Sequence, residues 1–220
     1  MNTLRIWDLP TRLFHWALVA CFFGLFITGK RGGDAMEWHF RFGYTMASLL
    51  LFRLAWGLVG GRWSRFAAFL YPPRALLAQL RGNPAPEHSA GHSPLGAASV
   101  LAMLLFLLAQ VGTGLFSEDK GEAFGPLSAL VSGATVRLAT GYHKNIGQLV
   151  LLALVLLHLA AIAYYQLRLH RNLVKPMITG DKRLAEPVPA SRDDAWSRLA
   201  AAALLLASAA LVGWVVQLGG

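Results

Sequence analysis

Histidines are the residues of this sequence whose type and placement could support chemistry. Residues 141–165 read GYHKNIGQLVLLALVLLHLAAIAYY, an almost wholly apolar run that holds His143 and His158. His15 and His39 lie in two further apolar runs near the amino terminus. An ionisable ring in hydrocarbon is costly and usually has a partner or a functional role, and imidazole is the commonest metal ligand. Metal binding is therefore the first chemistry to consider.

The single cysteine narrows the choice of metal centre. Cys21 is the only cysteine, and it lies inside the first apolar run. Internal disulfides, cysteine zinc sites, iron–sulfur clusters and covalent haem attachment through C-x-x-C-H are excluded, because each needs at least two cysteines. A tightly bound metal would have to use histidine.

Composition indicates a membrane protein. Of the 220 residues 55% are hydrophobic and only 14% are charged, and the mean hydropathy is +0.48. A bilayer core of about 30 Å needs roughly 20 mostly apolar helical residues to cross it. The long continuous runs lack the two-residue alternation of membrane barrels, so an all-α integral membrane helical bundle is predicted. Its five expected spans are about 9–29, 35–60, 94–116, 141–168 and 195–218.

Residues flanking the spans predict where some helices begin. Asp8, followed by Pro10, suits the start of the first helix, and Thr140 is placed to cap the fourth. The segment TGKRGGD after the first span lacks a signal-peptide cleavage pattern, so that span is expected to remain as a helix. In the loop 61–93, YPPRALLAQLRG predicts a short helix on the cytoplasmic interface.

Positive charges predict the orientation. The formal charge is +9, and most of the 20 Lys and Arg residues flank span ends on the same side as the amino terminus. By the positive-inside rule the amino terminus is cytoplasmic, and five spans then make the carboxyl terminus periplasmic. Membrane lipid is the expected environment. A nucleic-acid partner is not expected, because the basic residues do not form one groove.

The four histidines pair by depth. His39 and His143 lie near the outer ends of the second and fourth spans, whereas His15 lies towards the inside. His158 is fifteen residues after His143, which places it about 22 Å deeper at 1.5 Å per residue. A six-coordinate haem iron needs two imidazoles from opposite sides, since the porphyrin supplies four nitrogens. The expected pairs are therefore His39 with His143 and His15 with His158.

Three further residues are candidates for contact with such a cofactor. Gly43 and Gly147 each follow a histidine by four residues and would leave a gap beside its ring. Arg53, in the middle of the second span, points within about 40° of the direction of His39 and lies roughly 21 Å further in. It is predicted to neutralise a propionate of the inner haem. The alternative is a guanidinium that snorkels or bonds a helix carbonyl.

A purely structural interpretation stays open at this point. A histidine within a membrane helix can simply hydrogen-bond a neighbouring helix, and glycine patterns commonly serve helix packing. A transporter or a structural subunit would then hold no haem. His88, His92 and His170 lie in loops, where a solvated imidazole is ordinary, although His92 could contact a quinone head group or a propionate.

Several segments resemble the bacterial cytochrome b561 family, which includes the cytochrome b subunits of nickel–iron hydrogenases. They are RIWDLPTRLFHW, WHFRFGYTMASLLLFRLAWGLVGGRWSRF, GHSPLG and the run 142–165, and the resemblance covers about residues 5–180. It implies a four-helix core with two non-covalent haem b groups, and it matches His15, His39, His143 and His158 to the axial ligands. We therefore expect a di-haem domain at 1–180, then a linker and a fifth transmembrane helix at 181–220.

The expected activity follows from that resemblance. The chain would be the electron-transfer subunit of a respiratory oxidoreductase system in the bacterial inner membrane. It would move electrons between ubiquinone or menaquinone and a periplasmic redox protein such as a hydrogenase, a reductase or a cytochrome c. The alternative is a superoxide oxidase, for which Arg41, Arg137 and Lys144 could form a cationic funnel, opposed by Glu118, Asp119 and Glu122.

Overall fold

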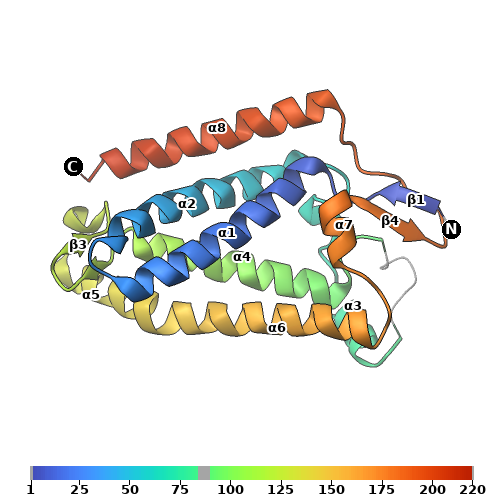
Figure 1. Ribbon diagram of the computed structural model, residues 1–220, viewed down its shortest axis with the longest axis horizontal. Coiled ribbons are helices and arrows are strands. Elements are labelled where there is room, and N and C mark those ends of the chain that lie inside the picture. Colours follow the sequence, from blue (N-terminus) through green and yellow to red (C-terminus); the bar gives the residue numbers. More distant parts are fainter. Residues whose placement is uncertain (1, 84–89, 220) are drawn as a thin grey trace. The chain divides into compact units, whose positions relative to one another are not determined.

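The structure is a computed structural model that describes residues 2–83 and 90–219. Within these residues, five helical segments are long and apolar enough to cross a membrane (Figure 1). They are α1 (Leu9–Arg31), α2 (Ala35–Val59), α4 (Pro94–Gly114), a continuous helix over Gly133–Leu167, and α8 (Ala195–Gln217). The predicted all-α membrane fold is confirmed, and His88 lies outside the described residues.

The fourth span begins earlier than the sequence predicts. It consists of α5 (Gly133–Gly141), a π-helix (Tyr142–Gly147) and α6 (Gln148–Leu167). The predicted cap at Thr140 is wrong: Ser132 is the capping residue and accepts a hydrogen bond from the Thr135 amide. The Thr140 hydroxyl instead accepts one from the Glu118 amide at 3.0 Å. The α5 sequence GATVRLATG is too polar and glycine-rich for hydropathy alone to reveal it.

Shorter elements connect these spans. The helices are α3 (Pro73–Leu80), which confirms the predicted short helix, and α7 (Val174–Thr179). The strands form two antiparallel pairs, β1 (Asn2–Arg5) with β4 (Asp181–Leu184) and β2 (Glu118–Asp119) with β3 (Ala123–Phe124). No strand was predicted. These strands are only two to four residues long, and their partners are set by the tertiary fold.

The chain divides into two compact units, which are described separately. The first unit comprises Met1–Leu13, Arg53–Ala102 and Leu154–Ala202. The second comprises Phe14–Phe52, Met103–Ala153 and Ala203–Gly220. Each of the five spans contributes residues to both units. The boundary at residue 180 that the sequence suggested remains a prediction.

A buried carboxylate organises the first unit. Asp8 has no exposed surface, and it accepts hydrogen bonds from the Thr11 amide at 2.8 Å, the Trp56 indole at 3.2 Å and the Ser64 hydroxyl at 2.6 Å. The predicted cap at Asp8 is thus confirmed, and three donors offset the cost of burying the charge. Gly61 lies so close to this carboxylate that a Cβ atom there would collide with it.

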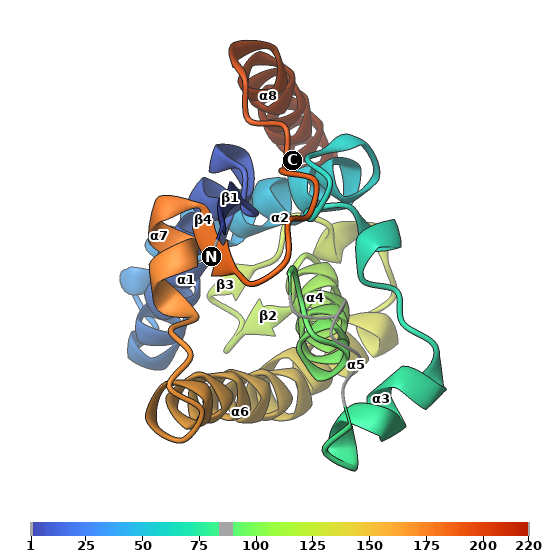
Figure 2. The ribbon, with the colours of Figure 1, turned by 90° about the vertical axis from the view of Figure 1, so that its right-hand side faces the viewer.

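The paired strands of the first unit close around a small apolar core. In the β1–β4 pair, Asn2 stands opposite Leu184, and the two strands lie side by side near the amino terminus (Figure 2). Ile6, Trp7 and Leu184 are buried together there. The segment 181–184 therefore holds the amino terminus in place as well as linking two helices.

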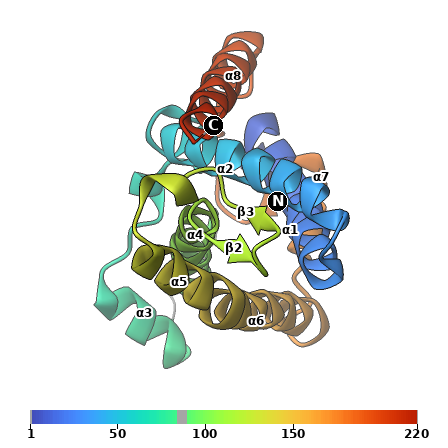
Figure 3. The ribbon, with the colours of Figure 1, turned by 90° about the vertical axis from the view of Figure 1, so that its left-hand side faces the viewer.

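In the second unit, a short hairpin covers the helix that carries His143. Strands β2 and β3 pair next to α5 (Figure 3). The Lys144 ammonium donates to the Asp119 carboxylate at 2.7 Å, which ties the hairpin to the π-helix. This hydrogen bond, and then the positive charge of Lys144, hold the pKa of Asp119 below its usual value.

Candidate functional site

The structure brings two of the four candidate histidines close together. His39, in the second turn of α2, and His143, in the π-helix, both belong to the second unit. Their ring centroids are 6.2 Å apart, and the ring planes are nearly perpendicular at 84°. This is one of the two pairs that depth matching predicts.

Backbone carbonyls orient both rings. The Nδ1 atom of His39 lies 3.1 Å from the Leu25 carbonyl oxygen, and that of His143 lies 2.8 Å from the Gln110 carbonyl oxygen. A carbonyl oxygen only accepts hydrogen bonds, so each Nδ1 must carry the proton and Nε2 keeps its lone pair. Metal-binding histidines show this pattern, because the bond made by one nitrogen fixes the tautomer for the other.

The spacing of the rings suits an iron held between them. Metal–imidazole bonds of about 2 Å on both sides of a metal place the two ring centroids about 6 Å apart. Among the residues that the structure describes, no three His, Cys, Asp or Glu side chains gather to bind a bare metal ion. A haem iron needs only two protein ligands, so the donor set fits haem.

Two glycines that the sequence analysis did not single out lie against these rings. A Cβ atom at Gly29 would lie 3.1 Å from Cε1 of His39, and one at Gly114 would lie 2.9 Å from Cε1 of His143. Of the two predicted glycines, Gly43 borders open space, since its Cβ would meet only Leu25 at 4.0 Å. The gap expected beside Gly147 is filled.

Gln110 fills that gap and holds His143 at two points. Its backbone oxygen accepts from the His143 ring, and its side-chain amide donates to the His143 backbone oxygen at 2.9 Å. A Cβ atom at Gly147 would collide with the same amide. A π-helix shifts the backbone bonding from i+4 to i+5, and such turns occur frequently at functional sites. Gln110 is the only amide side chain in the apolar run 94–116, and this was a signal in the sequence.

Two cations near this pair form ion pairs. Lys144 bonds Asp119, and Arg41 bonds Glu37 at 2.5 Å while it lies over the Trp38 ring. Two of the three residues invoked for a cationic funnel therefore have acidic partners. The positive electrostatic field at this site is therefore weaker than three unpaired cations would produce.

Arg53 is buried in the first unit. It is only 3% exposed, and its guanidinium lies over the Phe66 ring at 4.8 Å and the Phe69 ring at 5.9 Å. Its Nη1 atom is buried without a hydrogen-bond partner among the described residues. The aromatic faces stabilise the charge only in part, so the site can still take an anionic or hydrogen-bond-accepting group.

His92 is the unexpected member of the first unit. Its ring packs between those of Trp7 and Phe69, with ring centroids 4.7 and 4.6 Å away. His92 is therefore not the solvated loop imidazole that the sequence analysis considered. Burial, and then the charges of Arg53, Lys182 and His158, lower the His92 pKa to about 3, so the ring is neutral at physiological pH.

The other predicted pair is divided between the two units. His15 belongs to the second unit, where its ring meets the Trp16 ring edge-on with centroids 5.0 Å apart. His158 belongs to the first unit and is partly exposed on α6. Their pairing remains a prediction.

These features define a class of protein. Five apolar helices, with opposed histidines on two of them, are typical of membrane bundles that hold a cofactor between facing helices. A family model described as prokaryotic cytochrome b561 matches residues 6–180, and the chain belongs to this family. A b-type cytochrome carries haem b and transfers electrons, so membership implies both for this chain.

Curated relatives agree with this assignment. A probable Ni/Fe-hydrogenase B-type cytochrome subunit of Bradyrhizobium diazoefficiens is 22% identical, over 84% of this chain and 87% of its own length. The subunit of the same name from Azotobacter chroococcum is 25% identical, over 86% of this chain and 92% of its own length. The probable Ni/Fe-hydrogenase 1 B-type cytochrome subunit of Escherichia coli K12 is 26% identical, over 57% of this chain and 66% of its own length. No solved structure matches the chain.

Proposed function

We propose that this chain moves electrons between a quinone and a redox partner through two haem b groups. His39 and His143 would hold one iron, and His15 and His158 the other. The observation that carries the proposal is the opposed His39–His143 pair, with each Nδ1 atom anchored on a carbonyl. Haem b supplies a one-electron ferric/ferrous couple.

The protein's part is to hold and tune that couple. Hydrogen bonds from Nδ1 to carbonyl oxygens keep the rings in place and raise their basicity as ligands. Gly29 and Gly114 let neighbouring backbone approach the rings, and Gly43 leaves room for a flat macrocycle. Arg53 offers a buried positive charge to a propionate of the inner haem, and its unbonded Nη1 atom supports this role.

The names of the relatives suggest the partner. Because they are named as nickel–iron hydrogenase cytochrome subunits, we take such a hydrogenase, docked on the periplasmic face, as the electron donor. Ubiquinone or menaquinone is the proposed acceptor. The chain would lie in the bacterial inner membrane, with a cytoplasmic amino terminus and a periplasmic carboxyl terminus. Residues 1–180 would form the di-haem domain, and residues 181–220 would add the fifth span.

Superoxide oxidation is not proposed. The comparisons give it no support, and the ion pairs of Arg41 and Lys144 weaken the cationic field that would draw superoxide in.

The test is electron transfer in the native assembly. The chain is purified in mild detergent with its bound partners, and its haem absorbance is followed after hydrogen is added. We expect reduction by hydrogen and reoxidation by added decylubiquinone. Haem that stays oxidised under hydrogen, yet is reduced by dithionite, would exclude hydrogenase as the donor. A reductase or cytochrome c that co-purified instead would then identify the partner.

A further inference from the structure

Two cavities of the second unit adjoin each other beside α2. The larger has a volume of about 770 Å³ and is bordered by α2, the 118–137 segment and the end of α8. The smaller, about 370 Å³, is lined only by residues of α2 and α8. Tyr44 and Val216 line both cavities, so one ligand can occupy the two together. Volumes of this order are typical of small-molecule sites.

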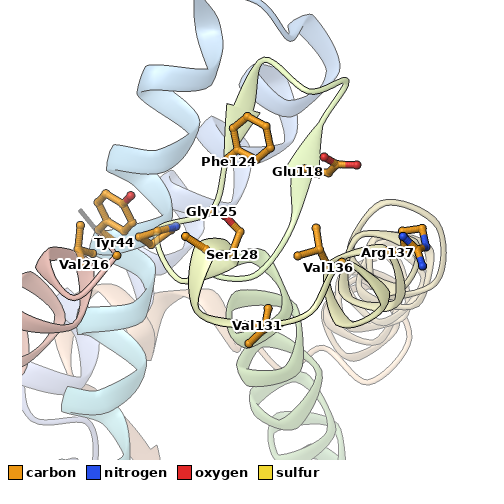
Figure 4. A pocket seen from close by; sticks show the side chains of 13 residues that line it. Tyr44, Glu118, Phe124, Gly125, Ser128, Val131, Val136, Arg137 and Val216 are labelled. Carbon is orange, nitrogen blue, oxygen red and sulfur yellow. The ribbon is translucent and has the colours of Figure 1, made fainter.

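The larger cavity is lined by two side chains of opposite charge. Figure 4 shows Glu118 and Arg137 on one side, Tyr44 and Val216 on the other, and Ser128 between them. Within the described part of the chain, no hydrogen bond or ion pair engages the Glu118 carboxylate or the Arg137 guanidinium. A ligand in this cavity can therefore meet both a charged acceptor and a charged donor.

The smaller cavity is an apolar groove with the length of one membrane leaflet. From Val216 to Leu205, both of which line it, α8 advances eleven residues, about 16.5 Å at 1.5 Å per residue. Half of a hydrocarbon core of roughly 30 Å is close to this length. A Cβ atom at Gly213 would meet no atom within 4 Å, so α8 leaves space in the groove. The groove thus suits a hydrocarbon chain that crosses one leaflet.

The charged cavity lies at the end of this groove where the helices stop. Val216 precedes the last residue of α8, Gln217, and the 118–137 segment links the end of α4 to the fourth span. Helix ends lie near the bilayer surface, where lipid head groups are found. A charged head beside the helix ends and a tail along the helices is the arrangement of a phospholipid.

The two charges indicate which head group fits. The guanidinium can donate to a phosphate, and the carboxylate can accept from an ammonium group. Phosphatidylethanolamine carries one phosphate and one primary ammonium. Phosphatidylglycerol has no cation to offset its repulsion by Glu118, and the quaternary ammonium of phosphatidylcholine has no N–H to donate.

We propose that the two cavities bind one phosphatidylethanolamine molecule, with its phosphate on Arg137, its ammonium on Glu118 and one acyl chain in the groove between α2 and α8. The lipid would fill the space between these two helices and so give the fifth span a contact with α2. The proposal depends neither on haem nor on electron transfer.

The test measures which lipid the full chain retains. The chain is placed in nanodiscs of equal parts phosphatidylethanolamine, phosphatidylcholine and phosphatidylglycerol with identical acyl chains. It is then released into mild detergent, and each retained lipid is counted per chain by mass spectrometry. Circular dichroism and thermal unfolding show whether each variant is folded.

Two pairs of variants probe the groove and the head-group site. Ala209→Trp fills the groove, whereas the neighbouring Ala210→Trp introduces the same side chain outside the lining. Glu118→Lys reverses one charge of the larger cavity, and Glu122→Lys makes the same change at an exposed position of the hairpin outside the lining. Arg137→Gln, also at an exposed position, is a second probe of the head-group site.

We expect the parent, Ala210→Trp and Glu122→Lys to retain phosphatidylethanolamine at least about tenfold over phosphatidylglycerol, the ratio that one hydrogen bond to a charged group can supply. Ala209→Trp should lose the lipid, and Arg137→Gln should retain at least about tenfold less of it. Glu118→Lys should reverse the preference in favour of phosphatidylglycerol, because two cations then line the cavity.

Three results would overturn the proposal. The first is a parent that retains no phospholipid or retains the three kinds equally. The second is equal retention by folded Ala209→Trp and Ala210→Trp. The third is an unchanged head-group preference in Glu118→Lys.

Discussion

The two rings of the outer pair are fixed by the backbone of neighbouring segments. The Leu25 carbonyl belongs to α1 and the Gln110 carbonyl to α4, so each imidazole is oriented by a helix other than its own. Both acceptors are backbone carbonyl oxygens, which every residue has, so the sequence does not reveal which residues supply them. The histidines could be predicted from their type and depth, but the acceptors could not.

Pairing of the histidines is directly testable. His39→Ala and His143→Ala should disturb one and the same spectral component, because the two rings share an iron in this account. His15→Ala and His158→Ala should disturb the other component. Low-temperature absorbance spectra of the reduced proteins would separate the two. If His39→Ala and His15→Ala changed one common component, the depth matching would be wrong.

Gln110→Leu should loosen His143 without removing its ring contact. The substitution deletes the bond from the side-chain amide to the His143 carbonyl, worth about 1 kcal/mol, and keeps the backbone acceptor. We expect a high-spin fraction in the outer haem, visible by electron paramagnetic resonance. Gly147→Ala should act in the same way, since its methyl group displaces the amide, and the double variant should be non-additive.

The matched control for that experiment is Gln166→Leu, which removes an exposed amide from α6. It should leave the spectrum unchanged. Full additivity of Gln110→Leu and Gly147→Ala would show that they act at separate sites and would refute the two-point contact as the cause.

Arg53→Leu tests the inner haem. A buried positive charge disfavours the ferric state, so its removal should lower the midpoint potential of the inner haem, on the order of 50 mV at an effective dielectric constant near 20. The outer haem of the same molecule is the internal control in a potentiometric titration. An unchanged inner potential, with both haems retained, would make Arg53 a packing residue against Phe66 and Phe69.

Among the elements, the spans were predictable and the small ones were not. Hydropathy located α1, α2, α4 and α8 to within two residues at each end, because lipid demands long apolar helices. It missed α5 because its residues are mixed in polarity. It missed the β1–β4 pair because Arg5 and Asp181 meet only after the chain has folded. The π-helix likewise contacts a residue of another helix, Gln110, whose amide donates to the His143 carbonyl.

A buried aspartate joins two elements of the first unit. Asp193 accepts from the Arg198 guanidinium at 3.0 Å, the Leu9 amide at 3.2 Å and the Arg5 guanidinium at 2.5 Å. Burial alone would raise the Asp193 pKa, but these three donors outweigh it and hold that pKa below its usual value. The bonds tie the start of α1 to the start of α8.

The lowered pKa of Asp193 determines how the stability of the protein should depend on pH. The pKa of Asp193 is lower in the folded protein than in the unfolded chain. Its contribution to the free energy of unfolding is therefore complete above about pH 4 and is lost as the pH falls through the pKa of the folded state. Asp193→Asn should cost about 1–3 kcal/mol near neutral pH and progressively less below pH 4. Thermal unfolding between neutral pH and about pH 3 measures it. The control is Asp34→Asn, which changes an exposed aspartate, and a pH-independent loss in Asp193→Asn would contradict the assignment.

At the scale of the whole molecule, family membership and local geometry point to the same activity. The family model covers residues 6–180, and the opposed His39–His143 pair lies within that range.

The central claim is that this chain holds two haem b groups between four histidines. A pyridine haemochrome assay on the purified chain, set against protein concentration from amino-acid analysis, measures it most directly. We expect two haem b groups per chain, both low-spin in the absorbance spectrum. A reproducible value near one would mean that only one histidine pair binds haem, and a value near zero would contradict haem binding by either pair.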